Sequence, residues 1–148
     1  MFFISHRGNI FGQNPKDENH PEYILEAISQ GFDVEVDVRS NNSQLFLGHD
    51  EPLYKIKIDF LENKRIWCHA KDTDTASILN DNKKVHFFFH ENDQITLTNQ
   101  GYLWTFPGKK IYSKSICVLP EQIEMKQNLK FCAGICSDKI SYYKQKYD

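Results

Sequence analysis

Short apolar runs recur along this chain, and most of them end at a polar residue, a proline or a glycine. Runs of this length are typical of buried β-strands and are too short to span a membrane. We expect eight strands, at residues 2–5, 32–38, 44–48, 65–71, 85–89, 102–106, 115–119 and 132–137. Eight strands separated by helices or loops favour a parallel sheet that closes into a (β/α)8 barrel.

The helices of such a barrel are expected to be few and short. The 148 residues suit one domain, 1–148, and fall below the roughly 200 residues that a (β/α)8 barrel usually needs. One helix is predicted from Pro21 to a terminating glycine, Gly31, and a second from Thr73 to about Leu79. The fold class is therefore α/β, a TIM-like (β/α)8 barrel miniaturised by replacing helices with loops. An open α/β sheet is the alternative.

Charge and cysteine content narrow the class of protein. The formal net charge is −2, from 18 basic and 20 acidic residues, so the basic surface of a nucleic-acid binder is not expected. The apolar start Met1–Ser5 is short and lacks a basic segment, which predicts a strand and not a signal peptide, and hence a cytoplasmic protein. The four cysteines form no CxxC pair and are expected to be reduced packing residues: Cys68, Cys117, Cys132 and Cys136.

Four polar clusters fall at the carboxyl-terminal ends of the first four predicted strands: His6-Arg7, Glu35-x-Asp37, His49-Asp50 and His69-x-Lys71. Each cluster alone is typical of a solvated strand end or a turn. Together they fall at the carboxyl ends of consecutive strands, where barrel enzymes build their active sites. The joint pattern therefore predicts one catalytic site.

The residue types in these clusters fit phosphodiester chemistry. Glu35 and Asp37 project from one strand face about 7 Å apart, and two such carboxylates in a shared pocket repel unless a hard divalent cation separates them. Histidines titrate near neutral pH, so His6 and His49 are expected to supply one base and one acid. Two further side chains match the charge of a phosphoryl group: Arg7 and Lys71.

Three motifs occur in a characteristic order: Ile4–Gly8, Gly31–Val38 and Gly48–Asp50, with Glu18-Asn19 ahead of the first predicted helix. Their order and spacing resemble those of the glycerophosphodiester phosphodiesterase family, within the wider phosphatidylinositol-phospholipase-C-like superfamily. Later in the chain, Ala70-Lys71 and Gly134–Asp138 are similar to the fourth and last strands of that family.

The resemblance implies a TIM-like barrel and specific roles for the clusters. His6 and His49 would be the paired catalytic histidines, Arg7 would contact the phosphate with help from Lys71, and a divalent ion, Mg²⁺ or Ca²⁺ with Mn²⁺ as an alternative, would bind at two acids, Glu35 and Asp37. Two features depart from the family. The large segment after its third strand is missing, and His69 stands where it has a third metal-binding glutamate.

Strand alternation puts His69 on the same face as Lys71. We expect its imidazole to bind the metal beside the two acids, which would favour Mn²⁺, Co²⁺ or Zn²⁺ over harder ions. The alternative is that His69 only hydrogen-bonds a carboxylate or the phosphate.

Other polar and aromatic residues are weaker candidates. His86, His90 and Glu91 flank the fifth strand. Its three consecutive phenylalanines do not show which face of the strand points into the barrel. Trp104 is expected in the core, with packing over a substrate as the alternative. Asp138 could reach the pocket or cap a final helix.

The sequence thus predicts a metal-dependent phosphodiesterase that hydrolyses a small or headgroup phosphodiester. Two alternatives stay open: a lyase of the same superfamily that releases a cyclic phosphate, and a degenerate barrel that binds a phosphorylated ligand or a protein without turnover. A barrel with few helices is also expected to cover bare strands as a homodimer.

Overall fold

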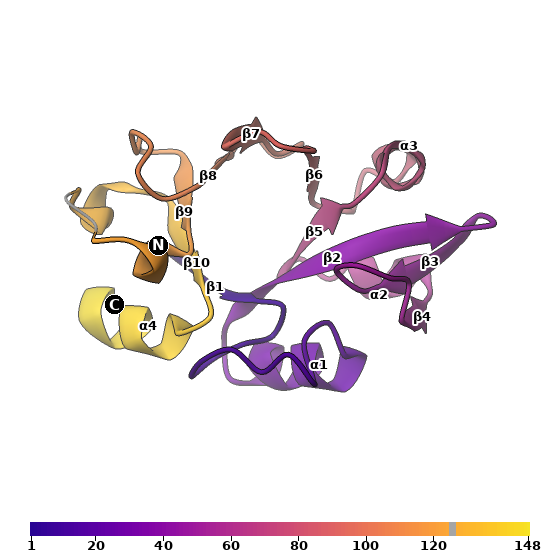
Figure 1. Cartoon of the computed structure of the whole chain (residues 1–148), viewed down its shortest axis with the longest axis horizontal. Coiled ribbons are helices and arrows are strands. Elements are labelled where there is room, and N and C mark those ends of the chain that lie inside the picture. The colour runs from indigo at the N-terminus through magenta and orange to yellow at the C-terminus, as the bar shows by residue number, and fades with distance from the viewer. Residues whose placement is uncertain (125–126) are drawn as a thin grey trace.

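The computed structural model describes residues 1–124 and 127–148, which form a mixed α/β fold around one curled sheet (Figure 1). The sheet has ten strands: β1 (Phe2–His6), β2 (Asp33–Asn41), β3 (Gln44–Leu47), β4 (Tyr54–Ile56), β5 (Ile66–Ala70), β6 (Phe87–Phe89), β7 (Ile95–Leu97), β8 (Leu103–Thr105), β9 (Ser115–Val118) and β10 (Gly134–Ser137). The helices are α1 (Pro21–Ser29), α2 (Ile58–Leu61), α3 (Thr73–Asp81) and α4 (Ile140–Tyr147), with 3-10 turns η1 (Pro120–Gln122) and η2 (Leu129–Phe131).

Parallel strands make up most of the curled wall, in the spatial order β6-β5-β2-β1-β10-β9-β8. The first and last strands are neighbours, with Phe2 opposite Gly134 and Ser5 opposite Ser137. At the far edge, β7 runs antiparallel to β8. Asn99, just after β7, connects this edge to β6, because its backbone N–H donates to the Phe87 carbonyl and its side-chain oxygen accepts from the Phe87 N–H, both at 2.9 Å.

The expectation of eight parallel strands is wrong at residues 44–48. That segment forms β3, which folds back antiparallel on β2, with Asn41 opposite Gln44. The two residues between the strands, Asn42 and Ser43, have φ values of 50° and 60°, the left-handed conformation that closes a two-residue hairpin. The hairpin continues to β4. The short strand β7, which was not among the predicted strands, contributes to the curled wall instead.

The two predicted helices are confirmed. α1 begins at Pro21, after His20 accepts a hydrogen bond from the Glu22 N–H at 3.3 Å, and ends before Gly31 at φ +86°. α3 begins after Asp72. Described residues 82–124 and 127–139 contain no α-helix, so the structure is a curled sheet with few helices and lacks the full ring of alternating helices of a TIM barrel.

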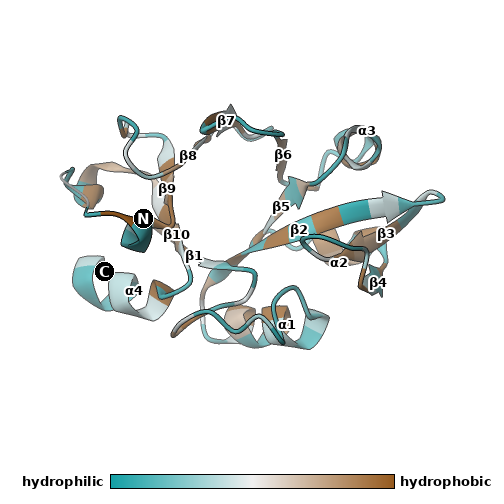
Figure 2. Cartoon of the chain, in the orientation of Figure 1, coloured by the Kyte–Doolittle hydropathy of each residue, from teal (hydrophilic) through white to brown (hydrophobic). Residues whose placement is uncertain are grey.

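Side-chain alternation along the strands separates two cores, and Figure 2 shows hydrophobic and hydrophilic segments alternating along β2. The outer core packs the convex face of the sheet against the helices and includes Val34, Val36 and Ile24. The inner core fills the concave side with large rings, among them Trp67 and Trp104. These rings fill the concave side below the carboxyl ends of the parallel strands, and a cavity remains at those ends.

Two further expectations concern cysteines and membrane spans. Cys68, Cys117, Cys132 and Cys136 are buried and not disulfide-bonded, as expected for packing residues. In the described part of the chain, every helix is too short or too polar to cross a bilayer.

Candidate active site

The polar clusters converge on one cavity of about 350 Å³ at the carboxyl end of the parallel strands. Six of the side chains singled out from the sequence line it: His6, Arg7, Glu35, His49, His69 and Lys71. The seventh, Asp37, is fully buried, and its carboxylate contacts three of the lining residues. The structure therefore brings all seven together.

Two carboxylates and one imidazole form the floor of this cavity. The register between β2 and β5 pairs Asp37 with His69, and alternation places Glu35 on the same inner face. The His69 Nδ1 atom lies 3.5 Å from Asp37 Oδ1 and 3.9 Å from Glu35 Oε1. One potential ligand atom from each of the three residues lies within 4.8 Å of the others.

Asp37 is surrounded by cations. Arg7 Nε lies 2.8 Å from Asp37 Oδ2, and Lys71 Nζ lies 3.4 Å from Asp37 Oδ1. Burial alone would raise the pKa of Asp37, but the contact with His69 and the charges of Arg7 and Lys71 hold it well below its usual range. In this structure Arg7 and Lys71 thus pair with a carboxylate, while the phosphate contact expected of them stays a prediction.

Glu35 has a different environment. Its nearest basic groups are the rings of His6 and His69, each with a nitrogen 3.9 Å from the carboxylate. Burial raises the pKa of Glu35, and the charge of Asp37 raises it further. A cation would relieve both effects.

The donor set fits a divalent ion. In each of its three residues one buried atom makes no hydrogen bond to a described residue: Glu35 Oε2, Asp37 Oδ1, whose nearest cation is Lys71 Nζ at 3.4 Å, and His69 Nε2, the ring nitrogen on the far side from the one nearest the carboxylates. Buried polar atoms are rarely left without a partner, and carboxylate oxygens with one imidazole nitrogen are ligands that Mg²⁺ or Mn²⁺ accepts. These three residues could therefore hold the expected metal.

His6 is held by an acid from the last strand. Its Nδ1 atom lies 2.7 Å from Asp138 Oδ1, an arrangement that leaves Nε2 for the cavity. Burial would lower the pKa of His6, but the hydrogen bond with Asp138 and the charge of Glu35 raise it overall. The question left open for Asp138 is thereby answered, since it reaches the site.

The Asp138 carboxylate is itself fixed by two amides. Asn9 Nδ2 donates to Asp138 Oδ1 at 2.8 Å, and Gln13 Nε2 donates to Asp138 Oδ2 at 2.9 Å. The Asp138 backbone N–H donates to Glu121 at 2.9 Å. The ring of His6 therefore rests on a carboxylate with little freedom to rotate.

His49 reaches the cavity by a different route from that expected. It follows β3, whose antiparallel return along β2 brings the Gly48 N–H to the Asp37 carbonyl at 3.0 Å. Gly48 has φ +151°, and a Cβ there would lie 2.0 Å from the Glu51 carbonyl oxygen, so the turn requires glycine. The His49 side chain is 42% exposed, and its Nδ1 lies 2.8 Å from Asp50.

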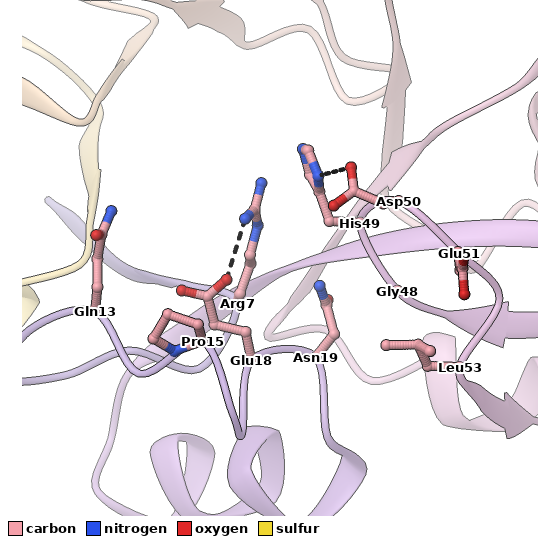
Figure 3. A pocket seen from close by; sticks show the side chains of 10 residues that line it. All are labelled: Arg7, Gln13, Pro15, Glu18, Asn19, Gly48, His49, Asp50, Glu51 and Leu53. Carbon is pink, nitrogen blue, oxygen red and sulfur yellow. Dashed lines mark hydrogen bonds and ion pairs between the residues drawn. The ribbon is translucent and has the colours of Figure 1, made fainter.

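A second, outer cavity of about 620 Å³ adjoins the first, and Figure 3 shows its lining side chains. Three residues line both cavities: Arg7, Gln13 and His49. In Figure 3, Arg7 and His49 point into the space between Gln13 and Asp50, and Glu18 holds the Arg7 guanidinium at 3.1 Å. The two cavities therefore meet beside the catalytic candidates.

Asn19 supports the floor of the site. Its side chain donates to Asp37 Oδ2 at 3.0 Å and accepts from the Asp37 N–H at 2.9 Å. It is 2% exposed and left-handed, with φ 63°. In the sequence Asn19 stands out only as part of a motif, because its role depends on a loop geometry that no periodicity reveals.

The weaker candidates divide between the site and the opposite end of the sheet. His90, Glu91 and Trp104 line the inner cavity, and the His90 ring stacks on His69 with centroids 4.7 Å apart. Trp104 is also a core residue, 3% exposed. His86 lies away from the cavity, where its ring packs on an inner-core tryptophan.

Comparisons with protein-family models, with curated proteins and with solved structures find no match to this chain.

Proposed function

We propose that the protein is a small metal-dependent phosphodiesterase, similar to the glycerophosphodiester phosphodiesterases, that hydrolyses a small phosphodiester by acid-base catalysis. The observation that carries the proposal is that two histidines from separate segments, His6 and His49, line one cavity above the Glu35, Asp37 and His69 trio. We also infer that the curled sheet is a shortened form of a TIM-like barrel.

The cavity residues divide the chemistry between them. One histidine removes a proton from water, the water oxygen bonds to phosphorus, and the other histidine gives a proton to the departing ester oxygen as its bond to phosphorus breaks. Because Asp138 holds Nδ1 of His6, its Nε2 is the atom aimed at the reacting group. A divalent ion bound by Glu35, Asp37 and His69 would stabilise charge on the phosphoryl oxygens.

Arg7 and Lys71 would orient the phosphate. Both contact Asp37, which places two cations at the edge of the proposed metal site. A phosphate there is negatively charged and accepts hydrogen bonds from both side chains. Their contacts with Asp37 hold them in place before substrate arrives, and this reduces the entropy lost on binding.

Hydrolysis of bis(p-nitrophenyl) phosphate with and without added Mg²⁺ or Mn²⁺ tests the proposal. We expect metal-dependent turnover that falls about 10²- to 10⁴-fold in His6→Ala and in His49→Ala. His20→Ala is the matched control, because His20 caps α1 outside the two cavities, and it should keep wild-type turnover.

Four results would contradict parts of this proposal. Near-wild-type turnover in either histidine variant would exclude the acid-base pair. Turnover that EDTA leaves unchanged would exclude the metal. Absence of turnover on every diester would favour a binding protein, and a cyclic phosphate that persists in phosphorus NMR spectra would indicate a lyase.

A further inference from the structure

The inner cavity has two unlike walls. Most of its charged side chains come from β1, β2, β5 and the loops that follow β3 and β5, and Glu91 follows β6, whereas the opposite wall comes from the ends of β8 and β9. That wall is apolar and partly aromatic: Trp104, Phe106, Val118 and Leu119. A phosphate group bound beside the charged wall would therefore have a hydrophobic surface facing it.

The apolar wall is rigid. The Trp104 ring stacks on Phe88 with centroids 4.4 Å apart, and the His90 ring meets Phe106 edge-on at 6.0 Å. These contacts tie the wall to the inner core below it. A wall fixed in this way can accept a flat or compact apolar group without first ordering its own side chains.

Leu119 reaches the cavity through a strained turn. Its backbone has φ 44° and ψ 51°, directly after β9, and its N–H donates to the Cys136 carbonyl at 2.7 Å. The left-handed conformation is unfavourable for a leucine, and such strain is concentrated at ligand sites. The turn orients an apolar side chain into a site rich in charges, where a ligand's apolar group would contact it.

The outer cavity differs in character. Beyond the shared residues Arg7, Gln13 and His49, its lining includes Glu18, Asp50 and Glu51. Glu18 is already paired with Arg7 at 3.1 Å, and Asp50 and Glu51 leave an excess of negative charge that favours a positively charged or hydroxyl-rich group. The two cavities meet at Arg7 and His49. A group bound there has the apolar wall of the inner cavity on one side and the carboxylates of the outer cavity on the other.

A phosphodiester has two ester arms that leave one phosphorus atom in different directions, which matches this arrangement. We propose that the substrate is an asymmetric diester: its apolar arm, an aromatic or short alkyl alcohol, lies against Trp104, Phe106 and Leu119. Its second arm, polar and carrying an amine or hydroxyls, lies in the outer cavity. This inference rests on the proposed function for the identity of the central group, but the apolar subsite can be tested without turnover.

Isothermal titration calorimetry with phenylphosphonate and methylphosphonate, in the presence of Mn²⁺, tests the apolar subsite. Both probes carry an inert P–C bond. We expect phenylphosphonate to bind about tenfold more tightly, because one aromatic contact is worth about 0.5 to 1.5 kcal/mol beyond the area it buries. Phe106→Ser should bring the two affinities to within about twofold of each other.

Two variants serve as controls. Phe131→Ser removes a phenylalanine that is 74% exposed in η2 and does not line the inner cavity, so it should keep the wild-type ratio. Phe106→Leu keeps an apolar side chain if the serine variant fails to fold, and it should reduce the ratio to about threefold. Equal affinities for the two phosphonates in the wild type, or no binding of either, would overturn the apolar subsite.

Two p-nitrophenyl diesters test the outer arm. The 2-aminoethyl and propyl esters have the same shape and differ in charge, and we expect kcat/KM to be about two- to fivefold higher for the aminoethyl ester, as for an exposed ion pair. Equal or reversed values would overturn the polar arm. If the protein prefers phenylphosphonate but hydrolyses no diester, the apolar subsite is supported and the phosphodiesterase proposal is refuted. If it hydrolyses diesters without preferring phenylphosphonate, the phosphodiesterase proposal is supported and the apolar subsite is refuted.

Discussion

The Asn19 side chain connects the loop after β1 to the buried carboxylate at the centre of the site, and its removal should destabilise the protein. Asn19→Ala deletes the bond to the Asp37 N–H at 2.9 Å and the bond to Asp37 Oδ2 at 3.0 Å. Asn19 and Asp37 are 2% and 0% exposed, so both bonds are buried in the folded protein.

The magnitude follows from these contacts. A buried group left without its partner costs about 1 to 3 kcal/mol. The Asp37 carboxylate keeps Arg7 at 2.8 Å, so the full penalty applies mainly to the N–H, and we expect the two losses to total about 2 to 4 kcal/mol. Alanine at φ 63° adds about 1 kcal/mol. This is a large fraction of the roughly 5 to 15 kcal/mol that stabilises a domain.

Asn42 provides a matched control, because it has the same left-handed backbone, φ 50°, but lies exposed in the β2–β3 turn. Urea unfolding of both alanine variants should show Asn19→Ala losing about 2 kcal/mol or more beyond Asn42→Ala. Glycine variants at both positions remove the backbone strain and should preserve this difference. If the two alanine variants unfold within about 0.5 kcal/mol of each other with equal m values, the buried amide does not support Asp37.

Three further predictions concern other parts of the molecule. Gly48→Ala should lower the melting temperature, because the alanine Cβ would lie 2.0 Å from the Glu51 carbonyl oxygen, at a cost of about 1 to 3 kcal/mol. Gly12→Ala is the control, because nothing lies within 4 Å of a Cβ at that position. Equal melting temperatures for the two variants would contradict the clash. Burial lowers the pKa of His86 to about 4, so the unfolded chain takes up a proton below about pH 6.5 and the folded protein does not. The free energy of unfolding should therefore fall as the pH drops from 6.5 to 4, by about 1 to 2 kcal/mol at pH 5. Urea unfolding at a series of pH values tests this. If His86→Gln shows the same pH dependence of the unfolding free energy as the wild type, His86 is not its source. His69→Glu should strengthen Mg²⁺ binding relative to Mn²⁺, measured by calorimetry against His69→Gln, and an unchanged preference would mean that His69 does not bind the metal.

Elements governed by local sequence were predictable. The strict alternation of valine and acidic residues in β2 predicted which side chains share a face, and Glu35 and Asp37 do so. Both ends of α1 were also predictable. Pro21 fixes its own φ at the start, and Gly31 accepts the positive φ just after the end. In each case the information lies within about ten residues.

The β2–β3 hairpin was not predicted, although polar residues separate its two strands in the sequence. Asn42 and Ser43 are compatible with several turn types, and the antiparallel return depends on both taking positive φ. As a result, His49 was placed at the end of a parallel strand, when it arrives at the site on a returning one. Its position near the site was expected for a different structural reason.

The contact between His6 and Asp138 shows what the pairing of the first strand with the last adds. These residues are 132 positions apart, and no local pattern connects them. The pairing of β1 with β10 sets Ser5 opposite Ser137, so the next residues, His6 and Asp138, are neighbours at the carboxyl edge. A parallel barrel requires its first and last strands to be neighbours, and side-chain alternation fixes which residues face inward. Placing the first and last predicted strands side by side would therefore have paired His6 with Asp138. The sequence left two roles open for Asp138, reaching the site or capping the final helix, and the strand register alone decides between them.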